Sequence, residues 1–98
     1  MKNGLESTFI EFRQVYPFVY TQRDEGWFQY ERHYHKWDIS LYILEGSLIF
    51  HFENGTKRRL KLGDRYDIPS WFFHTVDVWN DGCSYIVGQE FEDDEEYE

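Results

Sequence analysis

Residues 33–78 read HYHKWDISLYILEGSLIFHFENGTKRRLKLGDRYDIPSWFFHTVDV, and this stretch decides the fold. Short segments rich in β-branched and aromatic residues alternate with turns that contain glycine, asparagine or proline, which is the pattern of consecutive strands. The pair Asn54-Gly55 between two such segments is the strongest short signal for a hairpin. No segment keeps a helical hydrophobic period over a sufficient length, so the stretch predicts an all-β structure.

The same alternation of apolar segments and turns continues on both sides of this stretch. Aromatic residues make up 21% of the chain, and they favour a pleated, half-buried surface over a helix. We expect about eight to ten short strands, which at this spacing form a sandwich or a barrel. They include 9–15, 27–34, 40–44, 48–52, 57–62, 65–68, 74–78 and 84–91.

The charge of the chain is concentrated at its C-terminal end. The net charge is −9, and residues 90–98 carry seven acids and no base. We therefore expect one barrel domain over residues 1–91 and an acidic, disordered tail over residues 92–98. Nucleic-acid binding is not expected, because the sequence offers no basic face to neutralise phosphates. The run Lys57-Arg58-Arg59 is interpreted as part of a solvated strand.

Hydropathy and cysteine content favour a soluble, cytoplasmic protein. No apolar run approaches the roughly 18 residues that cross a bilayer, and the N-terminus lacks the hydrophobic segment of a signal peptide. The single cysteine, Cys83, has no partner for an internal disulfide and is interpreted as an inert residue. We therefore expect neither membrane insertion nor export.

Two histidines that lie two residues apart are the first candidates for a functional site. On a strand, His33 and His35 leave the same face with α-carbons roughly 7 Å apart, so both imidazoles can reach one ion. An isolated pair of this kind is a weak signal, but its surroundings strengthen the case. Another histidine, His51, alternates with Phe50 and Phe52 and is interpreted as a surface residue.

The surroundings resemble the two sequence motifs of the cupin family. The first motif runs Gly, five residues, His-x-His, three or four residues, Glu, six residues, Gly; the second runs Gly, five residues, Pro-x-Gly, two residues, His, three residues, Asn. Six positions of this chain agree with these spacings: His33, His35, Gly46, Gly63, Pro69 and His74. The resemblance implies a small double-stranded β-helix, the jelly-roll barrel of the cupins. It also implies that His33, His35 and His74 converge on a metal ion inside this barrel.

Four positions depart from the motifs. Ile39 stands where the family has its glutamate, so the carboxylate ligand is missing. The adjacent Asp38 has the opposite parity to His33 and His35 and would need a bulge to turn inward. The three other departures replace two glycines and an asparagine of the motifs: Trp27, Trp71 and Val78.

Three imidazoles without a carboxylate would leave a bound ion with its full charge of about +2, which favours an anionic or chelating ligand. Such a ligand set suits a divalent transition metal, with Fe, Ni, Zn, Cu and Mn as candidates. An apolar pocket for a small organic substrate is expected around the three histidines. The side chains expected to shape it are Ile39, Phe50, Phe52, Tyr66 and Trp71.

The resemblance leaves two functions open. The first is a metal-dependent enzyme, since some cupins with three-histidine iron sites are dioxygenases and others are isomerases, lyases or sugar epimerases. The second is a non-catalytic module that binds a small molecule, or acts as an accessory dimer, without metal; Ile39 and the bulky Trp71 favour it. We also expect a homodimer, in which a strand at 9–15 joins the partner's sheet and removes an exposed edge.

Overall fold

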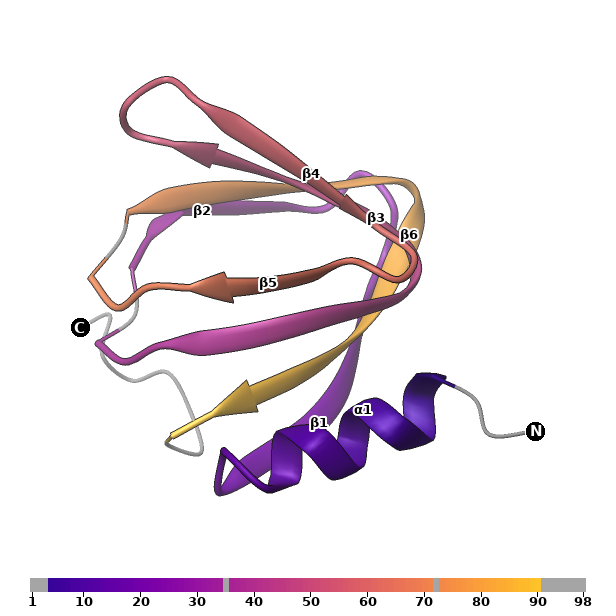
Figure 1. Cartoon of the computed structure of the whole chain (residues 1–98). Coiled ribbons are helices and arrows are strands. Elements are labelled where there is room, and N and C mark those ends of the chain that lie inside the picture. The colour runs from indigo at the N-terminus through magenta and orange to yellow at the C-terminus, as the bar shows by residue number, and fades with distance from the viewer. Residues whose placement is uncertain (1–3, 35, 72, 91–98) are drawn as a thin grey trace.

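The computed structural model describes residues 4–34, 36–71 and 73–90, of which residues 4–6, 32 and 33 are described as backbone only. Within these ranges the chain forms one helix and six strands (Figure 1). The elements are α1 (Gly4–Arg13), β1 (Phe18–Asp24), β2 (Gln29–His33), β3 (Ile39–Phe52), β4 (Lys57–Lys61), β5 (Arg65–Ile68) and β6 (His74–Gln89). No helix in the described ranges is long and apolar enough to span a membrane. The predicted all-β barrel is confirmed, with one helix added to it.

Two long strands, β3 and β6, hold the barrel together. The strands pair antiparallel in the order β1-β6-β3-β4, with β2 beside β6 and β5 beside β3. The first part of β3 pairs with β5 and its last part with β4, while β6 pairs first with β2 and then with β1. Each long strand therefore runs through both layers of the barrel, and these layers face each other in Figure 1. Between them lie Ile39, Leu41, Ile43, Leu48, Phe50, Leu60, Ile68, Val76, Val78, Cys83, Tyr85 and Val87.

The long strands bend where they cross, and glycine makes the crossing possible. The register between β3 and β6 shifts on both sides of Gly46, which has a φ of 78°. A Cβ atom on Gly46 would lie 1.9 Å from the carbonyl oxygen of Gly82. The expected separate strands at 40–44 and 48–52 are therefore one strand, because the chain passes through a bulge instead of a turn. The expected strands at 74–78 and 84–91 are likewise joined in β6, which ends at Gln89, while residue 91 lies outside the described residues.

The expected strand over residues 9–15 is wrong, because these residues lie in α1 and in the turn after it. The helix packs on the outer face of the sheet, where the Phe12 side chain is fully buried. Gly88 of β6 leaves room for this contact, since a Cβ there would lie 2.8 Å from Phe12 and 2.7 Å from Tyr16. The expected pairing of residues 9–15 with a partner's sheet thus loses its basis.

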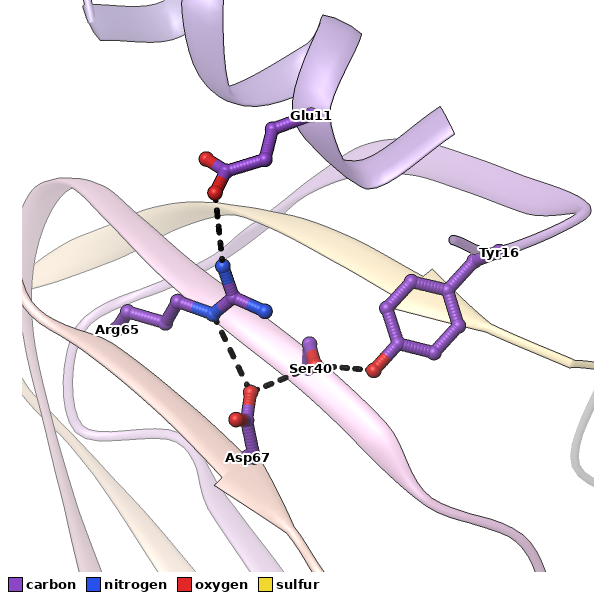
Figure 2. Close-up of polar contacts among 5 residues, drawn as sticks. All are labelled: Glu11, Tyr16, Ser40, Arg65 and Asp67. Atoms are coloured by element: carbon purple, nitrogen blue, oxygen red, sulfur yellow. Dashed lines mark hydrogen bonds and ion pairs between the residues drawn. The ribbon is translucent and has the colours of Figure 1, made fainter. Parts of the chain in front are cut away.

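Polar contacts fasten α1 and the turn after it to β3 and β5 (Figure 2). The Arg65 guanidinium lies 3.7 Å from the Glu11 carboxylate and 3.3 Å from that of Asp67. Asp67 accepts a 2.7 Å hydrogen bond from the Ser40 hydroxyl, whose oxygen lies 2.5 Å from the Tyr16 hydroxyl. Arg65 therefore binds acidic residues on the outside of the barrel.

The hairpin predicted at Asn54-Gly55 is confirmed between β3 and β4. Gly55 has a φ of 91°, and the Asn54 side-chain oxygen accepts hydrogen bonds from the backbone N–H and the hydroxyl of Thr56. The basic residues 57–59 that follow are exposed, as expected of a solvated strand.

Candidate functional site

His74, at the start of β6, lies on the inner face of the barrel and is only 2% exposed. Its ring centroid is 5.4 Å from that of Phe50. The Phe50 ring also contacts Tyr66 at 5.5 Å and Phe52 at 6.1 Å. The structure thus brings one predicted metal ligand together with three of the aromatic side chains predicted to shape the pocket.

Tyr66 is a neutral phenol in this cluster. Burial raises the pKa of Tyr66, and the Arg58 guanidinium, 4.9 Å from the ring centroid, opposes part of the shift. Because the ordinary pKa of tyrosine is already about 10, the hydroxyl keeps its proton at neutral pH. Tyr66 therefore contributes an aromatic surface and a hydroxyl, and no charge.

The two other predicted ligands lack described side chains. The backbone of His33 ends β2 and lies directly opposite His74 in the β2–β6 ladder, whereas His35 lies outside the described residues. Asp38 is exposed and accepts a 2.8 Å hydrogen bond from the backbone N–H of Ser70. Among the side chains that the structure describes, no three metal-ligating groups gather at one point.

The remaining pocket positions divide between the core and the surface. Ile39 is 4% exposed and pairs with Ile68 of β5 and with Gln89 of β6. Trp71 is 59% exposed and stacks on Tyr34, with ring centroids 5.4 Å apart. The aliphatic side chain at the motif's glutamate position is therefore part of the core, while Trp71 belongs to the surface.

His51 lies on the outer face of the sheet, as its parity predicts. Its Nε2 atom is 2.9 Å from the Asp77 carboxylate, which also accepts a 2.8 Å hydrogen bond from the Gln29 side chain. Both partners of this pair are more than a third exposed. His51 therefore provides a surface counterpart to the buried His74.

A buried carboxylate that was not identified from the sequence lies inside the barrel. Asp24, the last residue of β1, is 8% exposed. Its Oδ2 atom accepts a 2.7 Å hydrogen bond from the Tyr85 hydroxyl, and its Oδ1 atom accepts bonds from the Tyr30 hydroxyl (2.8 Å) and the Gln22 amide (3.2 Å). We call Gln22, Asp24, Tyr30 and Tyr85 the carboxylate cluster. Three donors replace the water that a buried carboxylate loses.

The carboxylate cluster keeps its phenols protonated. Desolvation, aided by the hydrogen bond to Asp24, raises the pKa of Tyr30 to about 12. The same two causes raise the pKa of the more deeply buried Tyr85. Burial also raises the pKa of the nearby Cys83 thiol to about 12, so this cysteine stays protonated, as expected of an inert residue.

We expect the free energy of unfolding to fall as the pH rises from about 10 to about 12. The unfolded tyrosines lose their protons near pH 10, whereas Tyr30 keeps its proton up to a pKa of about 12 in the folded state. The unfolded state then binds fewer protons than the folded state, so the stabilisation is complete below about pH 10 and is lost through this window. Urea unfolding at a series of pH values measures the slope, and Tyr30→Phe should reduce it. An unchanged slope in that variant would contradict the role of Tyr30.

A second group of hydrogen-bonded polar side chains lies near the other end of the β1–β6 ladder, away from the carboxylate cluster. The Gln89 side chain is 1% exposed; its Oε1 atom accepts a 3.1 Å hydrogen bond from the Trp37 indole, and its amide donates a 3.0 Å bond to the Tyr20 hydroxyl. Tyr20, Gln22 and Asp24 alternate along β1 and so share its inner face. This alternation is the sequence signal that points to both polar groups.

Comparison with known proteins supports the fold. No protein-family model matches the sequence, and no similar sequence is found among curated proteins. Solved structures do match. A cupin-2 domain protein of Shewanella frigidimarina is similar with a TM-score of 0.61 and 23% identity over 70% of this chain and 65% of that chain.

Two enzymes are also similar in fold. The DMSP lyase of Ruegeria pomeroyi matches 76% of this chain and 38% of its own length, with a TM-score of 0.66 and 24% identity. Oxalate decarboxylase of Bacillus subtilis matches 82% of this chain and 22% of its own length, with a TM-score of 0.64 and 23% identity. This chain therefore spans less than two thirds of all three proteins, and at these identities the likeness concerns the fold.

Proposed function

We propose that this domain, whose fold is that of the cupins, binds a divalent transition metal through His33, His35 and His74 and acts as an enzyme on a small organic substrate. The reaction is either a dioxygen-dependent oxidation or a metal-assisted isomerisation or elimination. The structures of similar fold include a DMSP lyase and an oxalate decarboxylase. The small molecules in these two names support the proposal of a small organic substrate.

The observation that carries this proposal is the burial of His74 directly opposite His33. His74 is 2% exposed and faces the aromatic cluster inside the barrel, so its place is not that of a surface histidine. The backbone of His33 lies at the register position opposite His74. The family spacing adds His35 to the same pair, and histidine is the commonest metal ligand in proteins.

The donor set fits a transition metal better than magnesium or calcium. Imidazole nitrogens suit Zn, Cu, Fe and Ni, whereas Mg and Ca prefer carboxylate and carbonyl oxygens. The nearest carboxylate in the motif, Asp38, is exposed and bonded to Ser70, and Ile39 offers no ligand atom. When bound, such an ion supplies Lewis acidity or redox chemistry at its open positions. Phe50 and Phe52 supply the apolar wall that excludes water from a substrate.

Burial of Ile39 favours a second candidate, a metal-free module that binds a small molecule. Ile39 packs in the core opposite Ile68, where the family motif has a ligating glutamate. In this candidate the buried imidazole of His74 would serve as a hydrogen-bonding group for the ligand. Metal content separates the two candidates.

We expect the wild-type protein, purified without a histidine tag and exposed to Fe, Ni, Zn, Cu and Mn in turn, to retain about one equivalent of at least one of these metals. His74→Ala should lower this content by at least about tenfold, because removal of one of three ligands breaks the set. Bound metal should also raise the melting temperature, since an ion held only by the folded state stabilises it. Elemental analysis and thermal melts provide both measurements.

His51→Ala is the matched control, because it removes the imidazole that lies on the outer face beside Asp77. Its metal content should equal that of the wild type. A wild-type protein that retains none of the five metals, with the two variants equally stable, would leave the metal-free module as the function.

A further inference from the structure

Gln89 is a buried amide on the inner face of the barrel. It ends β6 and lies directly opposite Ile39 in the β3–β6 ladder, at the level where the family motif has its glutamate. Alternation along β6 places Gln89 on the inner face with Tyr85 and Val87, both of which belong to the core. The residue is 1% exposed, so bulk water does not reach its amide group to form hydrogen bonds with it.

The orientation of this amide is fixed by its neighbours. The Trp37 indole N–H is only a donor, so the atom that meets it at 3.1 Å must be the Gln89 oxygen. The nitrogen then points to the Tyr20 hydroxyl and uses one of its two N–H groups there, at 3.0 Å. Within the described residues no other side-chain hydrogen bond involves Gln89. One donor is therefore left over on a buried group, and buried donors rarely stay unpaired.

We infer that the second N–H of Gln89 binds an oxygen atom of a small carboxylate ligand, which makes Gln89 a substrate-binding residue. The inference rests on the proposed function, because a metal held by three neutral imidazoles supplies a positive charge that attracts a carboxylate. The described residues that pair with Gln89 or hydrogen-bond to its side chain are all uncharged: Phe18, Tyr20, Trp37 and Ile39. They fit the uncharged body of such a ligand, while the amide fixes one of its oxygens.

Nuclear magnetic resonance of the ¹⁵N-labelled wild-type protein, loaded with diamagnetic zinc, tests this inference directly. The probe is pyruvate, a carboxylate that can also chelate, and acetone is its neutral counterpart. We expect pyruvate, and not acetone, to move one Gln89 amide proton and the Trp37 indole proton downfield. The Gln89 signals are assigned by their loss in Gln89→Glu, which retains an acceptor for Trp37 but removes both N–H donors.

Affinities of the variants give the second measurement. Gln89→Glu and Gln89→Leu should each weaken pyruvate binding by about tenfold or more, since a hydrogen bond to a charged group is lost. Their zinc content should stay at the wild-type level. Gln29→Leu is the matched control, because it removes a glutamine that contacts Asp77 on the outer face, and it should bind pyruvate as the wild type does.

Each outcome separates this inference from the proposed function. Zinc-loaded protein that binds pyruvate with unmoved Gln89 signals, or with equal affinity in all variants, overturns the inference and leaves the metal site intact. Zinc-loaded protein that binds no pyruvate, or whose Gln89 amide contacts only a bound water, overturns it as well. If the wild type takes up none of Fe, Ni, Zn, Cu and Mn but pyruvate still moves the Gln89 amide, the inference holds for a metal-free module and the proposed enzyme fails. If neither occurs, both fail.

Discussion

The Gly46→Ala variant is expected to lose about 3 kcal/mol or more of its free energy of unfolding. The added Cβ would lie 1.9 Å from the Gly82 carbonyl oxygen, and this neighbour is backbone that cannot rotate away. Alanine would also have to keep a φ of 78°, where a side chain is strained. Because each kcal/mol shifts the melting temperature of a domain of this size by about 4–8 °C, thermal unfolding should occur at least roughly 12 °C lower.

Gly55→Ala is the matched control for this prediction. Gly55 has a similar φ of 91°, but in the described part of the chain no heavy atom other than those of its chain neighbours lies within 4 Å of an added Cβ. The Gly55→Ala variant has the strain of the left-handed backbone without the steric conflict. Its free energy of unfolding should therefore fall by only about 1 kcal/mol. Melting curves followed by circular dichroism compare the two. Equal melting temperatures would mean that the bulge at Gly46 opens to admit a side chain, against the close crossing of β3 and β6.

The Asp24→Ala variant is expected to lose about 3 kcal/mol of its free energy of unfolding. Without the carboxylate, the hydroxyls of Tyr30 and Tyr85 lose the acceptor that they share inside the barrel. Urea unfolding near neutral pH measures the loss. Asp77→Ala is the control, since Asp77 also accepts two side-chain contacts but lies on the solvated face; it should cost less than about 1 kcal/mol.

A combined variant identifies the origin of this loss. Asp24→Leu with Tyr30→Phe and Tyr85→Phe removes the acceptor and both buried donors, while the half-buried Gln22 retains access to water. This variant should recover at least half of the stability lost by Asp24→Ala, because no buried hydroxyl remains unpaired. A single Asp24→Ala variant as stable as the wild type would show that the carboxylate cluster does not hold the fold together.

Features that depend on residues close together in the sequence were predictable. The hairpin at Asn54-Gly55 and the end of β5 before Pro69 follow from local backbone preferences. The bulge at Gly46 was not predictable, because whether a glycine ends a strand or bends it depends on its contact with Gly82, on another strand. The helix over residues 4–13 was also missed, because Ile10 and Phe12 alternate with polar residues as in a strand and the decisive packing of Phe12 involves distant parts of the sheet.

The candidate site was likewise predictable only in part from the sequence. Motif spacing led to His74, which indeed lies buried beside Phe50. The carboxylate cluster escaped notice because Asp24 precedes Glu25-Gly26 and reads as a turn residue, and its partner Tyr85 lies 61 residues away. Gln89 is held by Trp37 and Tyr20, 52 and 69 residues away, so its role depends on contacts that only the folded chain creates.

The continuity of β3 and β6 through both layers also governs how the barrel assembles. Neither layer can detach alone, because each half of the barrel shares these two backbones with the other. Equilibrium unfolding should therefore be a single cooperative transition without a half-open species. The β3–β6 ladder includes the pair Ile39 and Gln89. These two residues are far apart in the sequence, so a long loop must close before they can pair. High contact order of this kind places folding in the range of roughly milliseconds to seconds, far slower than for a helical bundle of equal length.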